Sequence, residues 1–444
     1  MEVALHDILH AREVRVAQQM QLLEKYSVPL ICFTMNIAGP IKTSPLIDRG
    51  FCAGMAALEE RIPEAYILNK TVNFSFTGNT AFYSVQMDAT QLKNICIDIE
   101  ESSALGRLYD MDVINTDGCK LQRDHERNCM VCGAPGRGCA ASRAHSIEQL
   151  QAVTTHILTD SLRDIDAARI ASEAVQSLID EVDTTPKPGL VDLRNNGSHT
   201  DMERRHFIAS AQALFPYFKK CIQIGQNTAH LSYEETFLLL RSAGIDAEKA
   251  MYTATSGVNT HKGVIYTLGV LCGSIGRLWS PETPICDLEM VLSECAKLVR
   301  TSVKTDFANA NGKTAGETLY RKYGIGGVRS EVANGLPSVK NIGLVFYHQA
   351  IADGFSRNDA GVYALLHLIA MVTDTNLYHR GGKQGAQWAM QAAATLLEAD
   401  PYPDMQQIET LDDAFISRNL SPGGCADLLA VTYFLSRIFH NGID

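Results

Sequence analysis

The sequence predicts a multidomain protein, with an N-terminal α/β domain over residues 1–160 followed by a larger all-α domain over residues 161–444. The chain has 444 residues, which is too long for one ordinary core. Apolar residues follow both strand and helix periods before residue 160, and almost only the helix period after it. A composition that is 46% hydrophobic and 20% charged is typical of globular structure throughout.

The first part of the chain carries signals for both helices and strands. An apolar run at residues 28–35 is bounded by Pro29 and the Asn36-Ile-Ala-Gly-Pro40 loop, which favours a buried strand. Residues rich in β-branched and aromatic types flank Thr77-Gly-Asn-Thr80 and predict a hairpin. The expected elements are a helix at 13–26, a strand at 28–35, paired strands at 66–76 and 81–87, a helix at 90–101 and a strand at 105–114.

The second part has the spacing of amphipathic helices and almost no strand-like alternation. Val264, Ile265, Leu268 and Leu271 lie on one helix face, and the same spacing recurs over residues 362–372. The domain junction is expected at residues 159–169, which contain no Pro/Gly/Ser linker. Helices are expected at residues 168–182, 207–224, 233–240, 264–278, 288–299, 362–372, 387–397 and 425–439.

Charge and hydropathy exclude several functional classes. The formal net charge is −11 with no basic run, so nucleic acid is not expected as a partner. The longest apolar stretch, residues 362–372, is interrupted by His367 and is too short to cross a bilayer, and residues 1–15 lack the apolar core of a targeting segment. Twelve irregularly spaced cysteines are typical of reduced thiols. We therefore expect a soluble cytoplasmic protein with no membrane contact.

Two carboxylates lie two residues apart in Gly106-Arg-Leu-Tyr-Asp-Met-Asp-Val113. On a strand, Asp110 and Asp112 project from one face while Met111 points toward a core. Such a pair can hold Mg²⁺ against a polyphosphate, and Arg107 is close enough in sequence to bind a phosphate oxygen. The alternative is the solvated face of an edge strand. The sequence predicts Asp110 and Asp112 as catalytic metal ligands and leaves that alternative open.

A cluster of metal-ligand types follows at Cys129, Cys132, Cys139 and His145. Two thiolates in a Cys-x-x-Cys pair, with a third thiolate and an imidazole downstream, can complete a tetrahedral Zn²⁺ site. The second half lacks the usual finger spacing, and the nearby arginines would equally suit an anion-binding loop. Reduced thiols without a metal are the third interpretation, and metal analysis of the purified protein distinguishes them.

Four polar clusters interrupt the helices of the second part. Polar side chains at this density beside glycines indicate a site, because burying them unpaired costs several kcal/mol each. The clusters are Thr185-Pro-Lys-Pro-Gly-Leu-Val-Asp192, Gly257-Val-Asn-Thr-His-Lys-Gly263, Thr314-Ala-Gly-Glu317 and Asp374-Thr-Asn-Leu-Tyr-His-Arg-Gly-Gly382.

Each of these clusters offers ligands for a nucleotide. The proline-braced loop that leads to Asp192 presents oxygen atoms suited to Mg²⁺ and a triphosphate, with capping of backbone N–H groups as the alternative. Lys262 stands at the start of a predicted helix, where N–H groups and the helix dipole favour phosphate, with Thr260 as a cap in the alternative. The candidates are Lys187, Asp192, Asn195, His199, Asp201, Asn259, His261, Lys262, Glu317, Arg329, Glu331, Asp374, Asn376 and Arg380.

Residues 9–150 resemble a known enzyme family. The segments that carry the resemblance are Pro29-Leu-Ile-Cys-Phe-Thr-Met-Asn-Ile-Ala-Gly-Pro-Ile-Lys42, Ser44-Pro-Leu-Ile47, Gly106 to Val113 and the cysteine segment through His145. They resemble the citrate lyase holo-acyl-carrier-protein synthases, also called apo-citrate lyase phosphoribosyl-dephospho-CoA transferases. The resemblance implies a nucleotidyltransferase-like domain that transfers the prosthetic group to a serine of the citrate lyase acyl-carrier (gamma) subunit and releases pyrophosphate.

Residues 173–429 resemble the triphosphoribosyl-dephospho-CoA synthases. The resemblance rests on the four polar clusters together with His199-Thr-Asp-Met202 and Ser421-Pro-Gly-Gly424. It implies that ATP and 3′-dephospho-CoA are joined through a ribosyl 1″,2′ link with loss of adenine. The product of this domain is the donor used by the first, so a bifunctional enzyme is expected.

The implied glycosyl transfer needs a carboxylate near the anomeric carbon, a base, a proton donor and a metal ion, expected to be Mg²⁺. The expected roles are metal or base for Asp192, Asp201 and Asp374; phosphate binding for Lys187, Lys262, Arg329 and Arg380; the reacting sugar for Glu317 or Glu331; and further substrate contacts for Asn195, His199, Asn259, His261 and Asn376. The alternatives are a metal-dependent nucleotide or ADP-ribose hydrolase and a non-catalytic zinc-bearing assembly factor.

Overall fold

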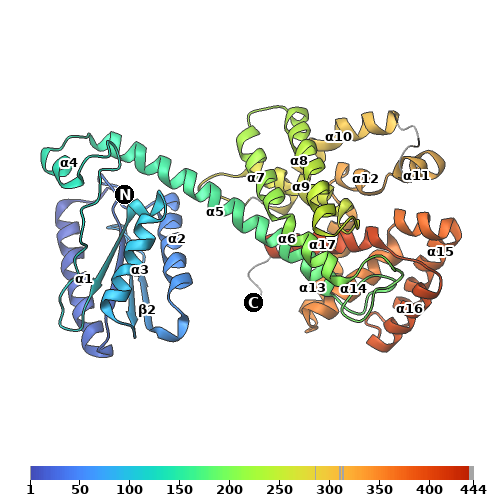
Figure 1. Ribbon diagram of the computed structural model, residues 1–444, viewed down its shortest axis with the longest axis horizontal. Helices are drawn as coiled ribbons and strands as arrows, with labels where there is room; N and C mark the ends of the chain where they lie inside the picture. The colour runs from blue at the N-terminus through green and yellow to red at the C-terminus, as the bar shows by residue number, and fades with distance from the viewer. Residues whose placement is uncertain (1, 286, 310–311, 313–314, 440–444) are drawn as a thin grey trace. The chain divides into compact units, whose positions relative to one another are not determined.

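The computed structural model describes residues 2–285, 287–309, 312 and 315–439 (Figure 1). The chain divides into two compact units, Met1–Ile165 and Asp166–Asp444, each with its own hydrophobic core. Thr314, the first residue of one predicted polar cluster, lies outside the described residues.

The first unit contains a four-stranded antiparallel sheet. Strand β1 (Leu30–Met35) lies between β3 (Thr80–Val85) and β4 (Tyr109–Ile114). Strand β2 (Ile67–Asn73) pairs with β3 and completes the order β2-β3-β1-β4. The predicted hairpin is confirmed by the pairing of β2 with β3.

Helices cover both faces of this sheet (Figure 1). Helices α2 (Pro45–Arg61) and α3 (Ala89–Glu101) pack on one face, where Phe33 of β1 belongs to the main core. Helix α1 (Leu5–Tyr26) covers the other face and packs Leu22 and Leu23 against a smaller apolar cluster. The two middle strands, β1 and β3, are therefore largely buried on both faces, whereas β2 keeps exposed residues such as Leu68.

Two predicted boundaries in this unit differ from the structure, and one helix was not predicted. Helix α1 begins at Leu5 instead of residue 13. The strand expected at residues 105–114 is wrong over its first part, because Leu105–Leu108 forms a 3-10 helix before β4. Helix α2 was not expected, although Ser44 caps it by accepting the Ile47 N–H at 3.2 Å and Pro45 is its first residue.

The expected junction at residues 159–169 falls inside a continuous helix, α5 (Ile147–Asp183). This helix has no Gly or Pro in any of its 37 residues, so nothing interrupts its backbone hydrogen bonds. The first unit is completed by the short helices η1 (Glu64–Tyr66), η2 (Leu105–Leu108) and α4 (Gly136–Ser142).

The described part of the second unit is helical, as predicted. It consists of the end of α5 followed by α6 (Arg204–Ala213), α7 (Phe215–Thr228), α8 (Tyr233–Ala254), α9 (Lys262–Leu278), α10 (Leu288–Ala308), α11 (Ala315–Tyr323), α12 (Gly327–Ala333), the π-helix η3 (Val339–Gly343), α13 (Leu344–Ala352), α14 (Arg357–Met371), α15 (Thr375–Ala399), α16 (Met405–Ser417) and α17 (Gly423–Phe439).

Helix α9 is the centre of the second unit, because α7, α8, α10 and α17 all pack against it. Glycines allow α7 and α9 to approach closely: a Cβ on Gly225 would lie 2.1 Å from the carbonyl oxygen of Gly273. The single helix expected at residues 207–224 is two helices, α6 and α7, which meet at Leu214 just before Pro216. These contacts fix the N-terminus of α9, which faces a cavity.

Among the described residues, no single helix is long and apolar enough to cross a membrane. One pair, α14 and α15, meets the length and composition criteria only when the two helices are counted together, and they are bent by 54° at their junction.

Candidate active sites

The second unit contains a cavity of about 780 Å³. Its wall is built from the end of α5 and the loop after it, the N-terminus of α9, the glycine-rich segment at residues 324–327, and the first turns of α15 and α17. Segments far apart in sequence therefore meet at one place. The predicted site residues on this wall are Lys187, His199, Asn259, His261, Lys262, Glu331, Asp374, Asn376 and Arg380.

Lys187 is neutralised at the cavity wall by a buried partner that the sequence did not suggest. Its side chain is 1% exposed, and its ammonium donates to Glu181 Oε1 at 2.5 Å and to the Glu181 carbonyl at 2.6 Å. Burial raises the pKa of Glu181, and the nearby Lys187 cation opposes that rise. The pair places a positive and a negative group beside the cavity with little net charge.

Arg380 braces the loop after α5 while facing the cavity. Its guanidinium donates to the Ser198 carbonyl at 2.8 Å and to Asn419 Oδ1 at 2.9 Å. A second guanidinium nitrogen lies 3.1 Å from His199 Nδ1. Burial, helped by the Arg380 charge, lowers the pKa of His199 to about 4, so this imidazole is neutral at pH 7.

His261 caps the start of α9 and leaves one ring nitrogen for a ligand. Its Nδ1 lies 2.7 Å from Ser210 Oγ, while its Nε2 is buried without a hydrogen-bond partner in the described structure. Burial, with a contribution from the Lys187 charge, lowers the pKa of His261 to about 3. A buried polar atom without a partner is uncommon, and this residue lines the cavity.

Asp374 caps α15 at the cavity wall. Its Oδ1 accepts the N–H groups of Asn376 at 2.6 Å and Leu377 at 3.1 Å, and its Oδ2 accepts the Cys425 N–H at 2.8 Å. Burial raises the pKa of Asp374, and these three hydrogen bonds oppose the rise. Asp374 is therefore the N-cap of α15, a role that the sequence analysis did not assign to it, and its Oδ2 keeps a lone pair for a further ligand.

Asp427 is a second carboxylate of this cavity, besides Glu181, that the sequence prediction missed. It projects from α17 and lies so close to the start of α9 that a Cβ on Gly263 would fall 2.0 Å from its Oδ2. The described structure gives it no hydrogen bond and no ion pair. Burial, followed by the charges of Glu181 and Asp374, raises the pKa of Asp427 well above its usual range.

Three predicted residues of the loop after α5 lie off the cavity wall. Asp192 accepts four hydrogen bonds, with Thr185 Oγ1 and the Lys187 N–H on Oδ2, and the N–H groups of Arg194 and Asn195 on Oδ1. These contacts use all of its lone-pair directions for the loop itself. The expected metal or base role of Asp192 is therefore not carried forward.

Asn195 and Asp201 also lie off the wall. Asn195 donates to Asp412 Oδ2 at 2.7 Å and accepts the Gly197 N–H, so it too organises the loop. Asp201 is exposed, and its Oδ1 lies 3.8 Å from His199 Nδ1. Neither residue is retained as a candidate ligand.

Two more predicted residues, Glu317 and Arg329, do not line the cavity either. Arg329 lies 3.4 Å from Asp306 in an ion pair, and Glu317 sits in the first turn of α11. Glu331, the other candidate for the reacting sugar, does line it and accepts the Ser338 N–H at 2.7 Å. Burial raises the pKa of Glu331.

The first unit contains a second cavity, of about 460 Å³. Asp110 contributes the carboxylate, and four cations surround the same space: Arg12, Arg15, Lys42 and Arg127. Partial desolvation, together with the charge of Asp112, raises the pKa of Asp110. One carboxylate among four cations suits a phosphate-rich ligand.

The predicted geometry of Asp110 and Asp112 is observed: both leave the same face of β4, while Met111 belongs to the core on the other face. Asp112, however, does not line the cavity and pairs with Lys120. Arg107 also lies off the wall and donates to the Asn128 carbonyl. The expected pair of metal ligands is thus reduced to Asp110.

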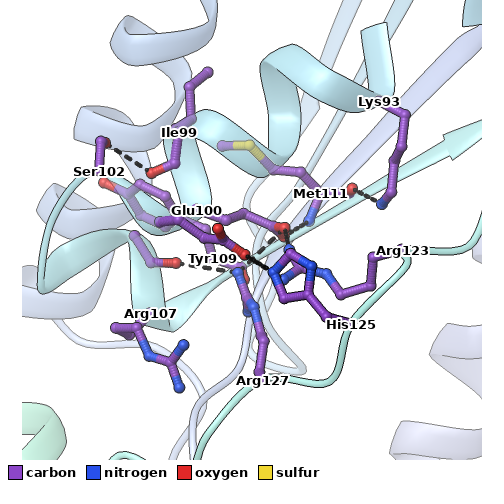
Figure 2. Close-up of polar contacts among 12 residues, drawn as sticks. Lys93, Ile99, Glu100, Ser102, Arg107, Tyr109, Met111, Arg123, His125 and Arg127 are labelled. Atoms are coloured by element: carbon purple, nitrogen blue, oxygen red, sulfur yellow. Dashed lines mark hydrogen bonds and ion pairs between the residues drawn. The ribbon is translucent and has the colours of Figure 1, made fainter. Parts of the chain in front are cut away.

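A buried carboxylate holds Arg127 against this cavity (Figure 2). Glu100 is 3% exposed; its Oε1 accepts the Met111 N–H at 2.8 Å, and its Oε2 lies 3.2 Å from Arg127 and contacts Arg123. Arg127 also donates to the Tyr109 carbonyl at 2.7 Å. The guanidinium is fixed by α3 and β4 and is not a freely moving surface cation.

Comparison with known proteins finds relatives of both units. A family model described as apo-citrate lyase phosphoribosyl-dephospho-CoA transferase matches residues 3–161, and one described as ATP:dephospho-CoA triphosphoribosyl transferase matches residues 167–443. Protein CitXG of Haemophilus influenzae is 35% identical, over 98% of this chain and 96% of that protein. The chain belongs to the CitXG family. Protein CitXG of Leuconostoc mesenteroides subsp. cremoris is 32% identical over 98% of this chain and 97% of that protein.

A single-activity relative matches the second unit alone. A Vibrio cholerae protein named probable 2-(5″-triphosphoribosyl)-3′-dephosphocoenzyme-A synthase is 41% identical over 59% of this chain and 85% of that protein. A CitXG chain is therefore a fusion of two transferase units, one CitX-type and one CitG-type, of citrate lyase prosthetic-group biosynthesis.

Several residues of this CitXG chain were accessible from the sequence but were not singled out. Arg12 and Arg15 lie three residues apart on α1, a spacing that puts them on one helix face. Asp427 is a lone charge in the apolar run of α17, directly after Ser421-Pro-Gly-Gly424. Burying an unpaired charge in an apolar helix costs free energy, so a lone aspartate in such a helix indicates a functional residue. This signal could have identified Asp427.

The buried pair of the CitG-type unit makes a stability prediction. Replacing Lys187 by methionine leaves the Glu181 carboxylate buried without its cation, which is expected to lower the free energy of unfolding by about 3–5 kcal/mol. Chemical denaturation followed by helical circular dichroism measures this loss. The double variant Glu181→Gln with Lys187→Met is expected to recover part of it; a double variant no more stable than the single one contradicts the pairing.

His367 makes a prediction about pH. Its ring stacks on Phe346, and burial lowers its pKa from 6.5 to about 4. Between pH 6.5 and pH 4 the unfolded chain binds a proton that the native state excludes, so His367 makes the free energy of unfolding fall as the pH falls through this window. His367→Phe keeps a ring on Phe346 and cannot titrate. The drop in melting temperature between pH 7 and pH 5 is expected to be smaller in this variant, and an unchanged drop contradicts the assignment.

Proposed function

We propose that the CitG-type unit joins ATP to 3′-dephospho-CoA and that the CitX-type unit attaches the product to citrate lyase. The first reaction forms 2′-(5″-triphosphoribosyl)-3′-dephospho-CoA and releases adenine. The second transfers the phosphoribosyl-dephospho-CoA group to a serine of the acyl-carrier (gamma) subunit and releases pyrophosphate. The observation that carries the proposal is the pair of cavities, each with cations and with a carboxylate that makes no hydrogen bond or ion pair within the described residues.

In the first reaction, the bond between C1″ of the ATP ribose and adenine breaks, and a bond from C1″ to the 2′-oxygen of 3′-dephospho-CoA forms. Asp427 accepts the proton of the 2′-hydroxyl, a role favoured by its raised pKa and its lack of other partners. Glu331, whose pKa burial also raises, supplies the proton that leaves with adenine. The positive charge that develops at C1″ is stabilised by the Asp427 carboxylate.

The triphosphate binds at the N-terminus of α9. The free N–H groups of this helix and its dipole favour an anion, and Lys262 and Arg380 line the same space. His261 Nε2 offers a neutral hydrogen bond to the substrate. The free lone pair of Asp374 Oδ2 suits Mg²⁺, which when bound neutralises phosphate charge.

In the second reaction, the serine oxygen of the carrier attacks the phosphorus next to the ribose, and the bond to pyrophosphate breaks. Arg12, Arg15, Lys42 and Arg127 bind the phosphates, and the charge of the departing pyrophosphate is stabilised by them. Asp110 accepts the serine proton or holds Mg²⁺, since its carboxylate has no hydrogen bond in the described structure. This arrangement is what we propose to be nucleotidyltransferase-like in the first unit.

One incubation tests both reactions. The whole chain is mixed with ATP, 3′-dephospho-CoA, Mg²⁺ and the apo-carrier; adenine and pyrophosphate are measured by chromatography, and the carrier by intact mass. We expect adenine release that requires 3′-dephospho-CoA, followed by a carrier heavier by one prosthetic group. Adenine release without 3′-dephospho-CoA would instead indicate a nucleotide hydrolase. Carrier binding with no pyrophosphate release would indicate a non-catalytic assembly factor.

A further inference from the structure

The segment that delivers Arg127 to the first-unit cavity has no hydrophobic core of its own. None of the residues from Asn115 to Ser146 is buried, and the segment's one helix, α4, is short and contains no buried residue. A segment of this length without its own packing is uncommon in a compact unit, because its ordering entropy is not offset by apolar burial. Small unpacked segments of this kind are usually fixed by a disulfide or a metal ion.

Four ligand-type side chains gather at one point in this segment. The ligand atoms of Cys129, Cys132, Cys139 and His145 all lie within 4.8 Å of one another. Cys132 Sγ lies 3.4 Å from Cys139 Sγ and 3.3 Å from His145 Nε2. A sulfur–sulfur disulfide bond is about 2.05 Å long, so the thiols are free.

The spacing of these atoms fits a tetrahedral zinc ion. With Zn–S near 2.3 Å and Zn–N near 2.0 Å, the edges of the tetrahedron are about 3.5–3.8 Å long, and the Cys132–Cys139 and Cys132–His145 distances are close to these values. Gly133, directly after the Cys-x-x-Cys pair, has a left-handed backbone conformation, and its N–H donates to the Cys129 carbonyl at 3.0 Å. The Val131 N–H points at Cys129 Sγ at 3.5 Å, as a donor to a metal-bound thiolate does.

The cluster is tied through the backbone to the cavity. Arg127 is two residues from Cys129, and its carbonyl accepts the Gly136 N–H at 3.0 Å, which closes the loop that carries Cys129 and Cys132. On the other side, Glu100 and the Tyr109 carbonyl hold the Arg127 guanidinium (Figure 2). Arg127 is thus held at one end by the folded core and at the other by the cysteine loop.

We propose that Cys129, Cys132, Cys139 and His145 bind a structural Zn²⁺ ion that positions Arg127 in the phosphate cavity of the first unit. The part of this inference that concerns Arg127 rests on the proposed transfer reaction. The zinc ion touches no substrate; it replaces the missing apolar core of residues 115–146 and thereby fixes a phosphate-binding cation. Loss of zinc therefore weakens transfer to the carrier without affecting the second unit.

The first test measures zinc in the whole chain, purified under reducing conditions, by elemental analysis. We expect stoichiometric zinc in the unmodified protein, and after replacement of zinc by Co²⁺ we expect the visible bands of a tetrahedral thiolate site. Cys132→Ser is expected to lose both. Cys119→Ser is the matched control, since Cys119 is an exposed thiol of the same segment outside the cluster, and it is expected to keep both. Zinc-free protein with an ordered, protease-resistant segment 115–146 overturns the proposal.

The second test compares the two activities in the same variants. Cys132→Ser is expected to lower carrier modification from supplied triphosphoribosyl-dephospho-CoA by about tenfold or more, with adenine release unchanged. Arg127→Ala is expected to lower carrier modification similarly while retaining zinc. Full carrier modification by zinc-free Cys132→Ser overturns the coupling to Arg127. If the unmodified protein binds zinc but never modifies the carrier, the zinc site is supported. The same result contradicts both the coupling of zinc to transfer and the proposed function of the first unit.

Discussion

The variant Asp427→Asn is expected to lower adenine release from ATP and 3′-dephospho-CoA by about 10²–10⁴-fold, the usual contribution of a positioned general base. The amide is nearly the same size but cannot accept the hydroxyl proton. The Asp427 carboxylate makes no hydrogen bond or ion pair in the described structure. The melting temperature of the Asp427→Asn variant is therefore expected to stay close to that of the unmodified protein. Removal of a buried charge can even raise it.

Two further variants help to show whether the loss of adenine release depends on the position of the Asp427 carboxylate or on its charge. Gly263→Ala keeps the Asp427 charge but displaces the carboxylate, because the new Cβ would lie 2.0 Å from Oδ2; a loss of activity is expected here too. Asp374→Asn is expected to lower both activity and stability, since Asp374 accepts three backbone N–H groups at the start of α15. Near-normal adenine release by Asp427→Asn would remove Asp427 from the reaction.

The second large effect is expected at Asp110. Asp110→Asn should lower transfer from supplied triphosphoribosyl-dephospho-CoA to the apo-carrier by about 10²-fold or more, whether the carboxylate acts as a base or as a metal ligand. Adenine release should be unaffected, because that reaction is assigned to the other unit. Intact mass of the carrier over time measures the transfer rate directly.

Asp112→Asn is the matched control for Asp110→Asn. The two aspartates leave the same face of β4, but Asp112 pairs with Lys120 and does not line the cavity. We expect Asp112→Asn to retain most of the transfer rate. Equal losses in the two variants would mean that both carboxylates serve the reaction, as the Asp-x-Asp spacing alone suggests.

The sequence was informative where local periodicity decides the structure. Alternation placed Asp110 and Asp112 on one strand face, and the turn residues Thr77-Gly-Asn-Thr80 predicted the pairing of β2 with β3. Helical spacing identified α9 as a core helix with a polar cluster at its N-terminus. In each of these cases the local structure depends mainly on residues that are close together in the sequence.

The sequence was less informative about which polar side chains reach the cavity. Asp192 and Asp427 are both aspartates near glycines, yet Asp192 accepts hydrogen bonds from its own loop, while Asp427 makes no hydrogen bond or ion pair among the described residues. Residue type and spacing do not contain that difference, because it depends on which backbone N–H groups the folded loop presents. The sequence shows that Arg12 and Arg15 share a helix face, but it does not show that this face meets Asp110, because that depends on the packing of α1 on the sheet.

Helix α5 has a consequence for how two enzymes came to be one chain. Leu158 belongs to the core of the first unit and Ala167 to that of the second, yet both are on this uninterrupted helix. A synthase that stands alone has to nucleate its first helix, the step in which several residues are ordered for a single hydrogen bond. In this chain α5 begins in the first unit, so its part in the second unit extends an existing helix and needs no nucleus of its own. The connection between the two units is therefore a stretch of α-helix held by its backbone hydrogen bonds, and it is not a flexible linker of the kind that proteases cleave.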